Sequence, residues 1–352
     1  MSKASSLRVG VIGTGAFAEA CHLPGLLSHP QAAVVGICGR QFSRTKTVAD
    51  RFGVPFATSD PAELCAHPEV DAITICTPTA FHLEHALLAI EHGKHVFCEK
   101  PLACTVGEAE SMTAAAKAAG QLHQVAFTFR HLFGVAELVR RVKAGDVGEP
   151  YFLRVHHEFQ DGLKPEPAAG WRHLPGFAGG VLYETGSHLL DVAQLVLGHA
   201  SAIKADLWSR PGVGTEDIAI ASLHSASGAI GHLFASRVTT PRTPNHVQVM
   251  GRDGTLETLI SRGAHDTLRH ARRGEMTWEE LPLPEEARDG QPHALGRMMR
   301  SFVNGCLRGC LMEGAASFDD GLAVQRLIAA AEKSSEARSP IPVPLPTTVP
   351  LR

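Results

Sequence analysis

The chain has 352 residues, which suggests two domains, because a single hydrophobic core seldom grows beyond about 250–300 residues. Its 33 Lys and Arg residues nearly balance 36 Asp and Glu residues, and no long run of one charge indicates a nucleic-acid partner or an anionic membrane. No apolar stretch approaches the ~20 residues that span a bilayer, and no signal-peptide core precedes the first apolar strand. We therefore expect a cytoplasmic enzyme or binding protein.

The eight cysteines lie mostly in apolar segments, and no two of them form a Cys-x-x-Cys pair. In such surroundings a thiol packs as a small hydrophobic side chain. His82 and His85 are close in sequence, but their neighbours supply no consistent third metal ligand. We therefore expect a reducing compartment and no bound metal.

From Leu7 to about Phe129, short apolar runs alternate with Ala-rich helical stretches. This alternation is typical of βα units on a parallel sheet. Strands are predicted at 8–12, 33–38, 72–76, 95–98 and 123–128, and helices between them include 81–91 and 106–119. The pattern predicts an α/β domain with a doubly wound parallel sheet over residues 1–128.

After residue 150 the pattern changes to longer alternating strands, predicted at 151–159, 203–208, 217–224, 229–238, 246–250 and 255–259. Short turns join successive strands, which favours antiparallel pairing. Helices at about 294–307 and 318–335 follow, and the proline-rich end cannot continue a helix. Residues 129–352 are therefore predicted to form an α+β domain.

The segment DIAIASL predicts a sheet that is apolar on both faces. Ile218 and Ile220 point to one face, while Ala219, Ala221 and Leu223 point to the other. Because a lone solvated face is then unfavourable, we expect a homodimer or homotetramer built on this sheet. The alternative is that helices of the same chain cover both faces.

The first predicted strand leads into VGVIGTGAFA, which matches the G-x-G-x-x-G/A fingerprint with Gly13, Gly15 and Ala18. Glycine at the first two positions permits a tight turn and lets backbone N–H groups approach a pyrophosphate at the helix N-terminus. The turn follows a strand, opens a helix and begins a run of βα units. This context predicts a dinucleotide site that includes the intervening Ala16 and Phe17.

The end of the second strand predicts which dinucleotide binds. An NAD site usually places Asp or Glu there to bind the adenosine ribose, but residues 31–49 contain no carboxylate. Arg40 and Arg44 follow the strand instead, and a guanidinium can pair with a 2′-phosphate. We expect NADP(H) to be preferred, with NAD(H) possible. Alternatively, both arginines are solvated residues of the next helix.

Two further strands end in polar residues, because the fourth runs into CTPTAFH and the fifth into CEKP. Ligands of an open α/β sheet collect at the carboxyl ends of its strands. Two charges placed directly after an apolar strand and before a proline are well placed for chemistry. The residues predicted to face the cofactor here are Cys76, Thr77, Pro78, His82, Glu99 and Lys100.

In the second half, GGVLYETGSHLLD is predicted to be a glycine turn followed by a helix. If the helix starts at Tyr183, one face carries Glu184, His188 and Asp191, so that a carboxylate can orient the imidazole. The alternative is that His188 is structural or solvated, as most helical histidines are.

Taken together, six segments resemble the glucose–fructose oxidoreductase / inositol dehydrogenase / MocA (Gfo/Idh/MocA) family. They are VGVIGTGAFA, TPTAFH, EKPLA, the Trp171-Arg172 pair, GGVLYETGSHLLD and EDIAIASLHSASGAIGHLFAS. Their order and spacing extend the resemblance over nearly the whole chain. It implies a Rossmann domain followed by a domain built on an open, mostly antiparallel sheet.

The resemblance also implies roles. Lys100 matches the catalytic lysine, His188 the histidine that binds or deprotonates the reacting hydroxyl, and Glu184 accompanies it as a third predicted catalytic residue. Glu99 and Lys100 would touch the nicotinamide ribose, while Trp171 and Arg172 would reach the nicotinamide end. The predicted substrate contacts are Lys100, Arg130, His157, Tyr183, Glu184 and His188.

The sequence departs from the family pattern at two positions. Glu184 stands where Asp is common, and Thr128-Phe129-Arg130 replaces Asn-Tyr-Arg. We expect reversible hydride transfer between a nicotinamide and a carbinol carbon of a sugar, polyol or related cyclic hydroxy compound. The alternatives are a redox-neutral, nicotinamide-dependent glycosidase and a dinucleotide-binding sensor without turnover.

Overall fold

The computed structural model describes residues 6–163, 170–173, 176–241, 244–260 and 266–344, without the side chains of 172–173 and 288–292. The chain splits into two compact units: residues 1–131 with 292–322, and residues 132–291 with 323–352. The chain therefore enters the first unit twice. The functional domain boundary at 128/129 stays a prediction.

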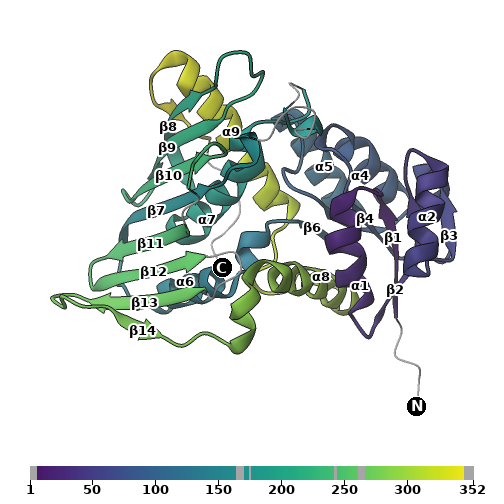
Figure 1. Ribbon diagram of the computed structural model, residues 1–352, viewed down its shortest axis with the longest axis horizontal. Coiled ribbons are helices and arrows are strands. Elements are labelled where there is room, and N and C mark those ends of the chain that lie inside the picture. The colour runs from purple at the N-terminus through teal and green to yellow at the C-terminus, as the bar shows by residue number, and fades with distance from the viewer. Residues whose placement is uncertain (1–5, 164–169, 174–175, 242–243, 261–265, 345–352) are drawn as a thin grey trace. The chain divides into compact units, whose positions relative to one another are not determined.

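The first unit contains a six-stranded parallel sheet with the strand order β3-β2-β1-β4-β5-β6 (Figure 1). Chain order reverses between β1 and β4, and ligands of such sheets bind at this switch point, outside the carboxyl ends of the strands. The strands are β1 (Leu7–Ile12), β2 (Ala32–Cys38), β3 (Phe56–Thr58), β4 (Ala72–Ile75), β5 (His95–Cys98) and β6 (His123–Val125).

Two of these strands differ from the sequence-based expectation. β3 has only three residues, too few to show a pattern of alternation, and it was not predicted. β6 ends at Val125 rather than at 128, because the backbone turns there: the N–H groups of Phe127 and Thr128 donate to the carbonyls of Val125 and Ala126. A 3₁₀ turn, Thr128–His131, follows.

Helices of the first unit follow the strands. α5 begins with a capping box, in which Thr105 and Glu108 each bond the backbone of the other, and it ends at Gly120 in the left-handed region. Its bounds match the predicted helix at 106–119. α8 supplies Met298 and Phe302 to the core of this unit. The helices are α1 (Leu23–Leu27), α2 (Phe42–Phe52), α3 (Pro61–Ala66), α4 (His82–Glu91), α5 (Val106–Ala119) and α8 (Gly290–Arg308).

The second unit is built on a nine-stranded sheet with the order β14-β13-β12-β11-β7-β10-β9-β8-β15 (Figure 1). Only β7 and β10 pair in parallel among its described strands, so the sheet is mostly antiparallel, as expected. The strands are β7 (Pro150–Glu158), β8 (Ala200–Trp208), β9 (Ile218–Ser225), β10 (Ile230–Ser236), β11 (Asn245–Gly251), β12 (Gly254–Ile260), β13 (Thr267–Arg272), β14 (Glu279–Leu281) and β15 (Ile341–Pro342).

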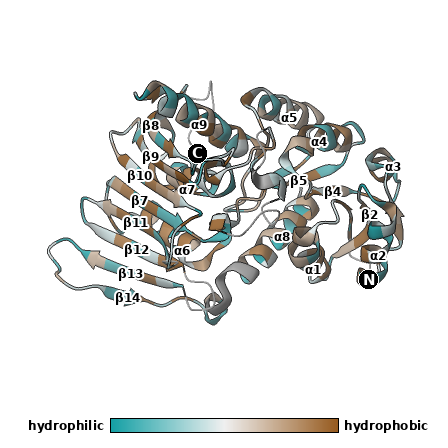
Figure 2. Ribbon diagram, turned by 45° about the horizontal axis from the view of Figure 1, so that its top comes forward, coloured by the Kyte–Doolittle hydropathy of each residue, from teal (hydrophilic) through white to brown (hydrophobic). Residues whose placement is uncertain are grey.

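The two faces of this sheet differ in cover. α6 (Phe133–Ala144) and α7 (Ser187–Leu197) pack against one face, where Val155 and Leu223 are buried. The other face carries Trp208, 51% exposed, and Ile220 and Ile230, each 39% exposed. Figure 2 shows apolar and polar stretches interleaved along the strands. The last helix is α9 (Phe318–Ala337).

None of the described helices is long and apolar enough to cross a membrane.

Candidate active site

The glycine-rich turn of the first unit has the geometry of a dinucleotide site. Gly13 has φ +126°, and a Cβ there would meet the Cys76 sulfur at 2.7 Å. At Gly15 a Cβ would meet no protein atom within 4 Å, so the backbone stays open to a ligand. Residues 16–27 then run as one helical stretch, and Ala18 is fully buried where the helix packs. These residues fit a bound pyrophosphate.

The space after β2 admits no carboxylate. A Cβ on Gly39 would lie 2.5 Å from the Thr14 hydroxyl and 2.8 Å from the Thr45 hydroxyl, so those two side chains exclude any larger residue. The neighbouring Arg40 is exposed and has no hydrogen bond or ion pair with the described part of the chain. The absence of Asp or Glu at this point is therefore built into the local packing.

Arg44, the second predicted phosphate ligand, is already engaged. Its Nε donates to the Thr14 carbonyl at 2.9 Å, and its NH2 group donates to Glu19 at 2.8 Å. Glu19 also pairs with Arg51. Arg44 therefore ties helix α2 to the glycine-rich turn, and its predicted contact with a 2′-phosphate stays a prediction.

The loop after β4 is held by histidines. The His82 ring is 1% exposed and lies between three backbone carbonyls, 3.0 Å from Thr77 and 3.1 and 3.2 Å from Pro101 and Leu102. Burial lowers the pKa of His82. A ring enclosed in this way joins the loop after β4 to the loop after β5. His82 would therefore act on a cofactor indirectly, by holding these two loops in place. Thr77 accepts or donates a further hydrogen bond with His85 at 3.2 Å.

Glu99 and Lys100 lie directly after β5, at the carboxyl edge of the sheet. One carboxylate oxygen of Glu99 accepts the Lys100 backbone N–H at 3.2 Å. The other lies 3.0 Å from Nε2 of His22, a fully buried residue that sequence reasoning missed. A single histidine in an apolar helix gives no sequence signal, and only the fold brings it to Glu99.

Arg130 is a buried anchor of the first unit. Its side chain is 5% exposed, pairs with Asp320 at 3.0 Å and donates to the Ala315 carbonyl at 3.2 Å. Burial opposes the charge of Asp320, but Arg130 and hydrogen bonds from Ser317 outweigh it and lower the pKa of that carboxyl. These contacts hold the segment after β6, and the predicted substrate contact of Arg130 stays a prediction.

In the second unit the predicted helix starts differently from expectation. Leu182–Gly186 forms a π turn, and α7 begins only at Ser187. A π turn repeats at i→i+5 rather than i→i+4, so the α-helical spacing that placed Glu184 and His188 on one face does not apply there. His188 is 8% exposed, and π turns of this kind are frequent at functional sites.

The π turn is supported by two partly buried acidic side chains. Glu216 accepts the Leu182 backbone N–H at 2.8 Å, and burial raises the pKa of Glu216 to about 7. Tyr183 donates its hydroxyl to Glu332 of α9 at 2.9 Å. Gly180, with φ +107°, leaves room for the Glu216 carboxylate, which a side chain there would meet.

The neighbouring histidines of β7 face opposite sides of the sheet. His157 is 9% exposed and shares the helix-covered face with Val155, whereas His156 lies on the other face with His246 and Phe234. Of these two, only His157 lies on the face against which α7 packs, and its predicted substrate contact stays a prediction. Trp171 and Arg172 lie in the 3₁₀ turn Gly170–His173, and the Arg172 side chain is outside the described residues.

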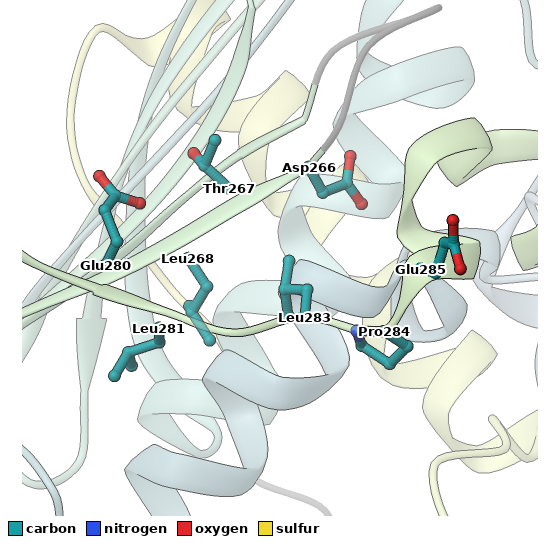
Figure 3. Close-up of a pocket in the computed structure, with 8 residues that line it drawn as sticks. All are labelled: Asp266, Thr267, Leu268, Glu280, Leu281, Leu283, Pro284 and Glu285. Atoms are coloured by element: carbon teal, nitrogen blue, oxygen red, sulfur yellow. The ribbon is translucent and has the colours of Figure 1, made fainter.

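A separate pocket of about 340 Å³ opens in the second unit, beside the start of β13 and the segment that follows β14. Asp266, Glu280 and Glu285 are among its lining residues (Figure 3). None of the predicted site residues lines this pocket. It therefore lies apart from the candidate site.

Comparisons with known proteins agree with this geometry. Residues 7–127 match the model of the GFO_IDH_MocA oxidoreductase family with an NAD-binding Rossmann fold, and residues 135–257 match a GFO/IDH/MocA C-terminal domain. An Escherichia coli D-glucoside 3-dehydrogenase is 31% identical over 219 residues, 60% of this chain and 60% of the relative.

A scyllo-inositol 2-dehydrogenase (NAD(+)) from Bacillus subtilis is 28% identical over 76% of this chain and 78% of its own. A solved levoglucosan dehydrogenase, in complex with NADH and L-sorbose, has a TM-score of 0.88 and is 24% identical over 97% of this chain and 99% of its own. The structural likeness supports the fold across both units.

Proposed function

The chain belongs to the GFO/IDH/MocA family of oxidoreductases, and on that premise we propose that it transfers a hydride between a nicotinamide dinucleotide and a hydroxyl-bearing carbon of a sugar or polyol. One observation carries the proposal: an open glycine-rich turn at Gly13 and Gly15 and the Glu99-Lys100 pair both lie at the carboxyl edge of one parallel sheet. The named relatives act on glucosides and inositols, which supports a cyclic polyhydroxy substrate.

The bound dinucleotide supplies the hydride acceptor or donor, and the protein supplies placement and proton transfer. Backbone N–H groups after Gly15 bind the pyrophosphate. Glu99 binds the ribose next to the nicotinamide, through carboxylate lone pairs that His22 and the Lys100 N–H leave open.

Lys100 removes the hydroxyl proton when the substrate is oxidised and returns it when a carbonyl is reduced. A nearby positively charged ring and partial removal from water both disfavour the ammonium form of a lysine. The neutral amine, which accepts the hydroxyl proton, is then easier to form than in solution. His188, which follows Glu184 by four residues, binds the same hydroxyl and shares the proton path.

The preferred cofactor is NADP(H). The exposed Arg40 is placed beside a Gly39 that cannot be exchanged for a carboxylate, because the Thr14 and Thr45 hydroxyls fill the space. A charge-assisted contact between Arg40 and the 2′-phosphate then distinguishes NADPH from NADH.

The active form is a homo-oligomer that uses the uncovered face of the nine-stranded sheet. Trp208, Ile220 and Ile230 are exposed on this face, and exposed apolar patches on a sheet favour burial against a second copy. Mass measurement in solution at micromolar concentration tests this point, and a monomer would contradict it.

A substrate panel tests the proposed activity. The purified protein is mixed with sugars, polyols and keto-sugars and with each of the four nicotinamide cofactors, and absorbance is followed at the reduced nicotinamide band. A stoichiometric change in cofactor supports the oxidoreductase. Sugar release with catalytic amounts of NAD would instead identify a glycosidase, and binding without either change would identify a sensor.

A further inference from the structure

His22 lies in the π turn Ala18–His22 that follows the glycine-rich turn, and its ring is fully buried. Phe17 and Phe97 contact it edge-on, with ring centroids 5.8 and 5.6 Å away. Its Nε2 lies 3.0 Å from Glu99 Oε1, a carboxylate whose side chain is 12% exposed. Two segments that are far apart in the sequence, the helix after the glycine-rich turn and the loop after β5, therefore meet at this hydrogen bond.

The surroundings of His22 favour one form of the ring. Nδ1 is buried and has no hydrogen-bond partner among the described residues. A proton on Nδ1 would be a buried donor without an acceptor, whereas a bare lone pair against aromatic rings is less costly. We therefore assign the ring proton to Nε2, which donates to Glu99.

Glu99 is then fixed by two donors. Oε1 accepts the His22 Nε2–H, and Oε2 accepts the Lys100 backbone N–H at 3.2 Å. If the first donor were absent, a mostly buried carboxylate oxygen would lack its partner, and the carboxylate would rotate towards water. That rotation would also release the backbone of Lys100.

We propose that His22 is a positioning residue that acts through Glu99: it holds the carboxylate in the orientation that binds the nicotinamide-side ribose and that fixes the backbone at Lys100. This inference rests on the proposed function, since it assigns Glu99 to that ribose. Its consequence should be confined to one half of the dinucleotide, because the proposal assigns Glu99 to the nicotinamide-side ribose.

The test compares His22→Phe with His22→Gln. Phenylalanine keeps the aromatic contacts but has no donor, while glutamine can place an amide N–H near the original Nε2. Binding of NADPH and of ADP, which lacks the nicotinamide-side ribose, is titrated by protein fluorescence. We expect His22→Phe to lower the affinity for NADPH about tenfold and to leave the affinity for ADP within twofold of the wild type. His22→Gln should recover most of the lost NADPH affinity.

A matched control is His29→Phe. His29 is also buried, and its Nε2 contacts Asn304 at 3.3 Å rather than a predicted site residue. This variant is expected to lower thermal stability without changing the ratio of NADPH to ADP affinity. If His29→Phe changes that ratio as His22→Phe does, a general loss of packing explains the effect and the proposal is wrong.

A double-mutant cycle with Glu99→Ala decides whether His22 acts through Glu99. In the Glu99→Ala background, His22→Phe should not lower the affinity for NADPH any further. A full additional tenfold loss would show a separate role and overturn the proposal, as would equal NADPH affinity of wild type and His22→Phe.

The binding readout needs no substrate, so the two proposals can fail separately. A wild type that binds NADPH but turns over no hydroxy compound contradicts the proposed activity, while the effect of His22 on NADPH remains measurable. A wild type that binds no nicotinamide dinucleotide overturns both.

Discussion

In the first unit, Glu99 and Lys100 lie on a loop held by imidazole rings and backbone groups. In the second unit the π turn before His188 is held by a carboxyl group that lies next to a buried ion pair in the sequence. His22 and His82 supply the ring contacts of the first unit. In the second, Glu216 accepts the N–H of Leu182, and the adjacent Asp217 is fully buried with Arg237.

This difference separates two kinds of dependence. Hydrogen bonds between loops position a few atoms and contribute modestly to stability. Removal of one partner of a buried ion pair destabilises the fold, because the remaining buried charge is no longer compensated. Changes at the first set should therefore alter turnover and cofactor binding, while changes at the second should alter stability and its pH dependence.

The largest effect is expected at Lys100. Lys100→Met should lower turnover by about 10²–10⁴, the range for a positioned acid or base. Cofactor affinity should stay within a few fold and the melting temperature should barely move. Initial rates, NADPH titration and thermal unfolding measure the three quantities.

Lys94→Met is the matched control for that variant. Lys94 donates to the backbone carbonyls of Val70 and His67, at 2.7 and 3.3 Å, in the same unit. The Lys94→Met variant should be somewhat less stable than the wild type and should keep its turnover. Normal turnover in Lys100→Met would remove this lysine from the mechanism.

Asp217→Asn should have the largest effect on stability, about 3–5 kcal/mol. Arg237 is fully buried and donates to Asp217 at 2.8 Å, as Arg210 does from the partly exposed side. Burial alone would raise the pKa of Asp217, but hydrogen bonds and charge from the two arginines outweigh it and lower the pKa to about 2.

The sign of the pH dependence follows from that shift. A lowered carboxyl pKa stabilises the fold above the unfolded value of about 3.9, and this contribution is lost as pH falls towards 2. The difference between wild type and Asp217→Asn should therefore shrink below pH 4. Asp253→Asn, which breaks an exposed pair with Arg252, should destabilise the fold far less than Asp217→Asn, and urea unfolding of the two variants measures both costs. Equal costs would contradict the distinction between buried and exposed ion pairs on which the comparison of the two units rests.

The sequence predicted the fold well where patterns are long. The Rossmann fold and the mostly antiparallel sheet were confirmed, as was α5 at Val106–Ala119. Short elements such as β3 (Phe56–Thr58) and β14 (Glu279–Leu281) escaped, because three residues show no periodicity.

The site was less accessible to sequence reasoning for a physical reason. The π turn at Leu182–Gly186 depends on contacts with Glu216, which lies 34 positions away from Leu182, and no local spacing encodes that contact. The His22–Glu99 bond spans 77 positions. The roles of the individual site residues stay predictions.

Cofactor choice distinguishes two arginines of the first unit. Arg40→Ala should lower the affinity for NADPH by about ten- to a hundredfold and leave the affinity for NADH unchanged, because a charge-assisted hydrogen bond contributes ~1.5–3 kcal/mol. Arg44→Ala should weaken both cofactors alike, because Arg44 holds the Thr14 carbonyl of the glycine-rich turn. Titration with both reduced cofactors measures the effects. Tighter NADH than NADPH binding in the wild type would show that Arg40 is only a solvated residue.

The smallest effect expected concerns Glu216, where the second unit carries a buried acid rather than an ion pair. Burial raises its pKa from 4.5 to about 7. Between those values the folded protein holds a proton that the unfolded chain has lost, so this group lowers stability as pH rises from 4.5 to 7.

Glu216→Gln removes the titration and keeps an oxygen that can accept the Leu182 N–H. We expect the variant to match the wild type near pH 4.5 and to be more stable at pH 8 by on the order of 1–3 kcal/mol. Urea unfolding of the variant and the wild type at the two pH values measures the difference. A variant that is less stable than the wild type at pH 8 would mean that the ionised carboxylate supports the π turn. Glu216 would then resemble the adjacent Asp217, whose charge two arginines stabilise.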